Sequence, residues 1–235
     1  MVKPSDNLVD TVYCDLRSKL QRSAISPSVR LVDTEIAATN GISRMPAREA
    51  LLRLVAEGYL IGTTRGFAVR ELSLEDISGL FEVRRQLEPR AAASAARDMT
   101  SDIEEELTAA MNRVEQMLNS DDISGLLAAN VEFRNAWLKA VSNPHMAATI
   151  SRFMDYFQSV RLGTFTDPAT AERYIDGLSR IYSAFLARDP LMVQDRMTLF
   201  MFAAEEAYLS VRRRQLQEAA ETRPGRRRNT RRGTA

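Results

Sequence analysis

The residues with the clearest chemical meaning are arginines spaced four and five positions apart. Arg44, Arg48 and Arg53 fall in a helical pattern whose apolar positions face inward, which leaves the guanidinium groups on the outer face. A guanidinium binds O6 and N7 of guanine through two hydrogen bonds, and it also pairs well with a carboxylate. Two roles therefore stand for Arg44 and Arg48: contact with DNA bases, or a solvated helix face that pairs with Glu49 or Glu57.

Groups that would support an enzymatic reaction are missing from the sequence. The chain has one histidine and one cysteine, and it contains no Gly-rich phosphate loop and no nucleophile elbow. Cys14 cannot form an internal disulfide, and its helical pattern with Val12 and Leu16 predicts a small buried side chain. We therefore expect a protein that is not an enzyme.

Three helices are predicted to position the arginines. A first helix over residues 7–23 is indicated by apolar residues that recur every four positions, at Leu8, Val12, Leu16 and Leu20. A second helix begins near Asp33 and ends at Gly41, a common left-handed stop. A third helix begins at Ser43, whose hydroxyl can cap it, and ends at Gly58. Its inward-facing residues are Ala50, Leu51 and Leu54. Helix, tight glycine turn and helix form a helix-turn-helix.

A wing and a helical body follow. Residues 59–61 and 67–70 indicate two short strands around a turn, with Arg65 near its tip and Gly66 permitting the reversal. From Leu74 onward the pattern is helical, at about residues 75–98, 101–119, 121–142, 144–165, 168–188 and 190–218. The predicted fold is mostly α: an N-terminal winged helix-turn-helix with a two-stranded wing and a C-terminal all-α antiparallel helical bundle.

Charge is distributed unevenly although the net charge is only +1. Residues 1–70 sum to +3, residues 71–210 to −9 and residues 211–235 to +7. We expect a DNA-binding domain over 1–72, an effector-binding and dimerisation domain over 73–218, and a basic disordered tail over 219–235 that either strengthens phosphate binding or only solubilises. The sequence lacks an apolar run of membrane-spanning length and a secretory signal, which favours a cytoplasmic protein without a membrane partner.

Several motifs resemble those of GntR-family transcription regulators of the FadR type. The segments are LVDTEIA (31–37), GISRMPAREAL (41–51) and LVAEGYLI (54–61) in the head, and LFEVRRQLEPRAAA (80–93), SNP (142–144) and ARD (187–189) in the body. The resemblance implies a homodimer that binds a double-stranded DNA operator, is expected to repress, and changes its operator affinity when a small molecule binds the helical domain. Two-fold symmetry suits two operator half-sites.

The resemblance also assigns residues to DNA contact. It implies that Arg44, Met45 and Arg48 belong to the recognition helix, that Ser43 offers a hydroxyl at the helix start, and that Arg65 and Gly66 form the wing tip. Two positions depart from the family pattern, because Thr34 replaces a supporting arginine and Met45 replaces a small or hydroxylated residue. The operator sequence therefore cannot be carried over from relatives.

Many related helical domains hold a divalent metal with one aspartate and three histidines. In this chain the aspartate position reads Asn130, the nearby histidine position reads Arg134, and the other two fall near Leu178 and Phe200. We therefore expect that the metal site is lost and that no cofactor is bound. Arg134 can supply positive charge in place of a metal and attract an anionic ligand directly.

Five residues are expected to bind the effector: Arg84, which matches a family arginine that faces the pocket, with Asn130, Arg134, Leu178 and Phe200. The favoured ligand is a carboxylate or phosphate held by Arg84 and Arg134. Three alternatives stay open. Arg134 pairs with Glu88 in a bundle that only dimerises, so that the protein represses constitutively. The other two alternatives concern one set of apolar side chains, which either line a pocket for an apolar effector or are ordinary core residues. These side chains are Met154, Phe157, Phe165, Leu178, Phe200, Met201 and Phe202.

Overall fold

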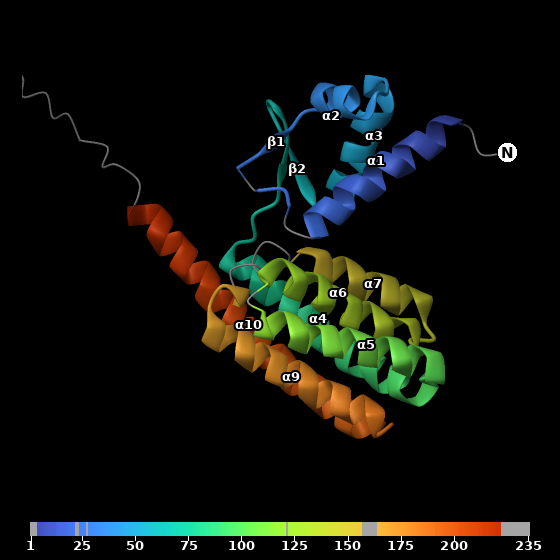
Figure 1. Cartoon of the computed structure of the whole chain (residues 1–235). Coiled ribbons are helices and arrows are strands. Elements are labelled where there is room, and N and C mark those ends of the chain that lie inside the picture. The colour runs from blue at the N-terminus through green and yellow to red at the C-terminus, as the bar shows by residue number, and fades with distance from the viewer. Residues whose placement is uncertain (1–3, 22–23, 27, 121, 157–163, 222–235) are drawn as a thin grey trace, which may run out of the picture.

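The computed structural model describes residues 4–21, 24–26, 28–120, 122–156 and 164–221. Its buried apolar side chains form two clusters, one between Val9 and Phe67 and one between Leu72 and Val211. The first cluster lies in a small helical head with a short sheet, and the second lies in a helical bundle (Figure 1). This arrangement confirms the predicted fold class of a winged helix-turn-helix followed by an all-α bundle.

The described residues of the head form three helices: α1 (Pro4–Gln21), α2 (Asp33–Asn40) and α3 (Arg44–Ala56). Gly41 ends α2 in the left-handed conformation at φ +63°, as the sequence indicates. On α1 the prediction of a buried Cys14 is wrong, because Cys14 is exposed, and Leu8 is exposed as well. The buried stripe of α1 consists of Val9, Val12, Tyr13, Leu16 and Leu20.

The sheet of the head has three strands, one more than predicted. The hairpin of β2 (Leu60–Thr63) and β3 (Gly66–Val69) matches the expected wing, and β1 (Arg30–Leu31) pairs antiparallel with the outer side of β3. A strand of two residues carries no readable alternation, so the sequence gives no sign of β1. Leu31 pairs with Phe67, and both side chains are buried.

The bundle begins at a well-formed helix start. In α4 (Leu74–Asp98) the Ser73 hydroxyl accepts from the Asp76 N–H, while the Asp76 carboxylate accepts from the Ser73 N–H at 3.0 Å. The helices α5 (Ser101–Asn119), α6 (Ile123–Lys139), α7 (Pro144–Tyr156), α9 (Pro168–Leu186) and α10 (Pro190–Glu221) follow (Figure 1). Predicted and observed bounds agree within a few residues, apart from the second half of the helix expected over 144–165, because residues 157–163 are not described.

Helix α10 packs along both α4 and α9, and α5 packs against α6. Helix α10 extends to Glu221 and therefore includes residues 219–221, which the sequence assigns to the tail. The rest of the tail, residues 222–235, lies outside the described residues, and the domain bounds at 72 and 218 stay predictions. Within the described residues, none of the helices is both long and apolar enough to span a membrane.

Candidate functional sites: a basic helix face and a buried cavity

Helix α3 presents two arginines to solvent from a well-anchored backbone. Its inner face is fully buried at Ala47, Ala50, Leu51 and Leu54. The side chains of Arg44 and Arg48 are 62% and 53% exposed on the opposite face, where a polyanion can reach them. Burial of four apolar side chains fixes the helix rigidly enough to aim both guanidinium groups.

A single carboxylate holds both arginines. Asp33, the first residue of α2, is buried, and its Oδ2 accepts from Arg44 Nε at 3.0 Å and from Arg48 Nη1 at 3.2 Å. These contacts, led by the hydrogen bond from Arg44, hold the pKa of the Asp33 carboxyl below its usual value. The pairing with Glu49 or Glu57 that was considered for these arginines is not what the structure shows, and Asp33 was missed as their partner.

Arg53 differs from the other two arginines although it lies on the same helix. It turns toward α1, where Nη1 donates to Asp10 at 2.9 Å, Nε donates to Glu57 at 3.3 Å, and the guanidinium lies 3.8 Å from the centroid of the Tyr13 ring. The Tyr13 hydroxyl donates to Glu57 at 2.5 Å, and burial with this hydrogen bond raises the pKa of Tyr13 to about 12. Arg53 therefore fastens α3 to α1 and does not share the surface of Arg44 and Arg48.

The start of α3 also faces solvent. Met45 is 76% exposed, and Ser43 occupies the residue before the helix without making a side-chain cap hydrogen bond. The prediction that the Ser43 hydroxyl caps α3 is therefore wrong. Its hydroxyl and the first N–H groups of α3 are the kind of donors that suit a phosphate oxygen.

The wing tip depends on glycine. Gly66 has φ +110°, and a Cβ at this position would lie 2.5 Å from the carbonyl oxygen of Leu31 in β1. The Thr63 hydroxyl donates to the Gly66 carbonyl at 3.0 Å and accepts from the Arg65 N–H at 3.3 Å, which closes the turn. Arg65 is exposed there, on a hairpin that packs against α3 through β2 (Figure 1).

A second candidate site is a small buried cavity of about 20 Å³ inside the bundle, which is room for about one water molecule. Four of the five predicted effector residues line this cavity: Asn130, Arg134, Leu178 and Phe200. They come from three helices, α6, α9 and α10. The remaining walls are Glu88, Phe133, Trp137, Tyr174, Ile181 and Met197.

Arg84 is the predicted effector residue that does not line the cavity. It is 2% exposed, and its guanidinium donates to the Glu88 carboxylate through Nε at 2.5 Å and Nη2 at 3.3 Å. Glu88 was considered as a partner for Arg134, but the structure pairs it with Arg84 one helical turn away. Arg134 instead donates to the Asn135 side-chain oxygen from Nε and Nη2, both at 3.3 Å.

The amide of Asn130 is the most informative polar group in the cavity. Asn130 is 3% exposed, and its Nδ2 has no hydrogen-bond partner among the residues that the structure describes. A buried donor without a partner costs about 1 to 3 kcal/mol, so its presence calls for a water or ligand acceptor. With the Arg134 guanidinium one turn along α6, the cavity offers hydrogen-bond donors to an anion.

The same four positions do not suit a metal ion. The four positions that correspond to metal ligands in related domains lie around one cavity. In this chain they include a guanidinium and two hydrocarbon side chains, which cannot coordinate a cation. In the described part of the chain, no three His, Cys, Asp or Glu side chains are grouped so that they could hold one. The donor set therefore fits an anionic or polar ligand and does not fit a divalent cation.

Of the apolar side chains considered for an apolar effector, Leu178 and Phe200 line the cavity. Phe165 and Met201 are buried in the bundle core, and Phe202 is 55% exposed. The side chains of Met154 and Phe157 lie outside the described residues.

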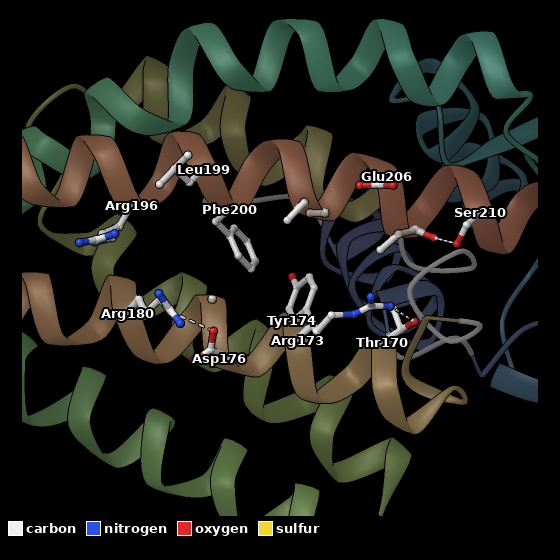
Figure 2. A pocket seen from close by; sticks show the side chains of 14 residues that line it. Thr170, Arg173, Tyr174, Asp176, Arg180, Arg196, Leu199, Phe200, Glu206 and Ser210 are labelled. Carbon is white, nitrogen blue, oxygen red and sulfur yellow. Dashed lines mark hydrogen bonds and ion pairs between the residues drawn. The ribbon is translucent and has the colours of Figure 1, made fainter.

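A larger groove of about 430 Å³ lies between α9 and α10, and sequence reasoning missed it (Figure 2). It shares Tyr174 and Phe200 with the buried cavity. Its other lining residues are Thr170, Arg173, Asp176, Gly177, Arg180, Arg196, Leu199, Ala203, Ala204, Glu206, Ala207 and Ser210. Nothing in the sequence pattern distinguishes these residues from an ordinary solvated pair of helix faces.

Comparison with known proteins yields matches over most of the chain. Residues 8–69 match the family described as bacterial regulatory proteins, gntR family, and residues 79–203 match the FCD domain. The HTH-type transcriptional regulator McbR of Escherichia coli K12 is 27% identical over 183 residues, which cover 74% of this chain and 80% of that protein. The HTH-type transcriptional repressor RspR of the same organism is 23% identical over 222 residues, which cover 90% of this chain and 93% of that protein.

Solved structures share the fold as well. The structure of E. coli McbR/YncC has a TM-score of 0.78 at 24% identity, and the alignment covers 91% of this chain and 100% of that chain. A putative GntR transcriptional regulator from Rhodococcus sp. RHA1 has a TM-score of 0.75 at 21% identity, with 86% and 97% covered. At these identities the likeness establishes a common architecture.

Proposed function

The chain belongs to the gntR family of bacterial regulatory proteins and carries an FCD domain, and on this premise we propose that it is a homodimeric repressor that releases its operator when a small carboxylate binds inside the bundle. Transcription regulation through DNA binding is what its relatives are named for. The proposal adds the contacts with DNA, the sign of regulation, the dimer, and a ligand held without a metal.

Sequence-specific contact is assigned to Arg44 and Arg48. Both guanidinium groups are exposed on one face of α3, and the Asp33 carboxylate restricts their orientation before DNA arrives. A restricted guanidinium loses less side-chain entropy when it forms a bidentate pair with guanine O6 and N7. Ser43 and Arg65 are assigned to phosphate contacts, which position the helix without reading bases.

A homodimer fits this mode of recognition. A helix-turn-helix protein with two-fold symmetry places two recognition helices one helical turn of DNA apart, and each α3 then reads one half-site. Repression is supported by the similarity to RspR, which is named a transcriptional repressor and aligns with 90% of the chain.

The observation that carries the effector proposal is the buried Asn130 amide beside the Arg134 guanidinium, in a cavity whose other walls are apolar or aromatic apart from Glu88, which is paired with Arg84. A carboxylate presents two oxygens, each with acceptor capacity, and can accept from both side chains at once. Because Asn130 and Arg134 are both buried, such charge-assisted hydrogen bonds are stronger there than on the surface. A neutral ligand would form only weaker hydrogen bonds with the Arg134 guanidinium, because it carries no negative charge.

A second candidate function rests on the size of the cavity. About 20 Å³ holds a water molecule, and a ligand needs more room than that. In this reading the bundle only dimerises, a water satisfies Asn130, and the protein occupies its operator constitutively.

Thermal unfolding with a panel of small carboxylates, each matched to its amide, separates the two functions. A ligand at a concentration of 100 times its Kd stabilises the native state by about 2.7 kcal/mol. A carboxylate that binds therefore raises the unfolding temperature, whereas its neutral amide does not. Arg134→Met is expected to abolish the shift, while the exposed Arg97→Met on α4 keeps it. Stabilisation by carboxylates that Arg134→Met leaves unchanged would contradict the proposed site, and no shift with any carboxylate would favour the constitutive repressor.

DNA binding is tested on duplexes that the protein itself selects from a random pool. If the ligand-free protein binds a selected duplex and the stabilising carboxylate abolishes that binding, the protein is a repressor that its effector releases from DNA. Tighter binding on addition would reverse the proposed sign of regulation.

A further inference from the structure

The buried cavity is too small to hold a whole metabolite. Its volume of about 20 Å³ accepts one water, whereas ligand pockets typically measure about 300 to 1,000 Å³. A carboxylate that reaches Asn130 and Arg134 must therefore place most of its atoms elsewhere. The groove between α9 and α10 adjoins the cavity and shares Tyr174 and Phe200 with it as walls.

Two aromatic rings separate the cavity from the groove. Tyr174 on α9 and Phe200 on α10 line both spaces, and their rings meet edge to face with centroids 4.8 Å apart. Figure 2 shows the two rings pointing toward each other from facing helices in the middle of the groove. Both residues are buried, so the paired rings fill the space between the cavity and the groove, here called the passage.

Gly177 on α9 allows the Phe200 ring to sit in this position. A Cβ at Gly177 would lie 2.6 Å from Phe200 Cδ2, which is closer than real Cβ contacts come. Glycine inside a helix costs about 1 kcal/mol relative to alanine, so α9 gives up helix stability at the point where the ring rests. The ring belongs to the side chain, and rotation about its own torsions can move it out of the passage without unfolding either helix.

The groove has the chemistry to hold the body of an amphipathic acid. Its surface includes the apolar side chains of Leu199, Ala203 and Ala207, while its rim carries three arginines and two acids. Arg180 is held by Asp176 at 2.8 Å, whereas Arg196 has no ion-pair or hydrogen-bond partner within the described residues. The positive excess at the rim attracts an anion toward the groove before it enters.

We infer that the buried cavity and the α9/α10 groove are two halves of one ligand site, with Phe200 and Tyr174 as the gate between them. The inference rests on the proposed function and specifies its ligand as an extended carboxylate with an apolar body. The carboxylate binds Asn130 and Arg134, and the apolar body occupies the passage opened by Phe200 and the groove beyond it.

Trp137 is a built-in reporter for this test. It is the single tryptophan of the chain, it is 2% exposed, and it lines the buried cavity. Entry of a carboxylate beside it changes its fluorescence, which can be followed by stopped-flow mixing of the full-length protein with octanoate. Octan-1-ol, which has the same chain and no charge, serves as the matched probe.

A gated site predicts a specific kinetic pattern. In the native chain the observed rate levels off as octanoate increases, because opening of the gate precedes entry. Phe200→Ala raises that limiting rate by roughly 2- to 10-fold, the factor that corresponds to the loss of one aromatic pair. Gly177→Ala displaces the ring and raises the rate in the same direction, whereas Gly79→Ala, a helical glycine on α4 with nothing within 4 Å of its Cβ position, leaves it unchanged.

The arms of the experiment separate failure of the gate from failure of the carboxylate site. Octanoate binding that needs Arg134 but has the same limiting rate in Phe200→Ala, Gly177→Ala and Gly79→Ala would overturn the gate alone. Acetate binding that needs Arg134, without octanoate binding, would overturn the extended site and keep the proposed function. Octanoate binding that is lost in Arg196→Met and kept in Arg134→Met would confine the ligand to the groove and overturn the joint site. If neither octanoate nor acetate changes the fluorescence of Trp137, the carboxylate proposal itself is overturned.

Discussion

Arg48→Ala provides the sharpest test of how the head binds DNA, because the structure offers a matched arginine on the same helix. Arg48 and Arg53 are both exposed on α3, but Arg48 shares the solvent-facing surface with Arg44, whereas Arg53 is fastened to α1. We expect Arg48→Ala to weaken operator binding without lowering stability. Arg53→Ala should do the reverse.

The expected magnitudes come from the contacts of each side chain. Loss of one bidentate base contact costs about 1 to 3 kcal/mol, which weakens operator binding about 5- to 150-fold. The stability cost of Arg48→Ala stays within about 1 kcal/mol, because its ion pair with Asp33 involves a side chain that is 53% exposed. Arg53→Ala removes two ion pairs and a cation–π contact with Tyr13, which together contribute about 0.5 to 2 kcal/mol.

Fluorescence anisotropy with a selected duplex and with a scrambled duplex of equal length measures the DNA effect at fixed salt concentration. Urea unfolding followed by circular dichroism measures the stability effect. A contact with bases lowers affinity for the selected duplex more than for the scrambled one, whereas a phosphate contact lowers both equally. Operator affinity that is unchanged in Arg48→Ala, or reduced as strongly in Arg53→Ala, would refute the docking of this helix face.

Three further substitutions test other parts of the structure. Asp33→Asn removes the charge that holds Arg44 and Arg48, and we expect the ratio of specific to non-specific affinity, measured by the same anisotropy assay, to fall by about fivefold or more; an unchanged ratio would show that Asp33 has no positioning role. The hydrogen bond from Ser73 N–H holds the pKa of Asp76 below its usual 3.8, so this carboxylate stabilises the fold above pH 3.8 and the stabilisation is lost as pH falls through the depressed pKa. The difference in urea midpoint between native chain and Asp76→Asn should therefore be largest near neutral pH and shrink below about pH 4; a difference independent of pH would contradict the charged cap. Glu71→Gln breaks the ion pair with Arg212, and we expect it to leave carboxylate affinity intact while reducing the effect of ligand on DNA binding; equal coupling in both proteins would exclude this contact.

Local patterns predicted most of the fold, and the errors on α1 show where such patterns fail. A spacing of four residues advances 400° around a helix, so a stripe at strict fourfold spacing drifts about 40° per step. Over the three steps from Leu8 to Leu20 the drift reaches about 120°, which leaves Leu8 exposed while Val9 and Tyr13 enter the core. Cys14 lies about 200° from both Val12 and Leu16, on the solvent side of the same helix.

The candidate sites divide in the same way. Asn130 and Arg134 lie one turn apart on α6, so their shared face could be predicted, and registration with the family motif brought Leu178 and Phe200 to the same cavity. Asp33 could not be predicted as the partner of Arg44 and Arg48, because that contact depends on how α2 crosses α3. The pairing of Arg84 with Glu88 was readable from the four-residue spacing, which favours an ion pair within one helix.

The continuity of α10 connects the proposed ligand site with the segment that leads to the head. Phe200 and Arg212 lie on this one helix, about 18 Å apart at the usual helical rise. Arg212 Nη2 lies 3.1 Å from the Glu71 carboxylate, and the neighbouring Arg70 donates to Asp76 at the start of α4. A surface ion pair contributes at most about 1 kcal/mol, whereas coupling between two sites typically amounts to about 1 to 3 kcal/mol. The contact of Arg212 with Glu71 can therefore supply part of the coupling, and we expect the remainder to come from the packing of α10 against α4.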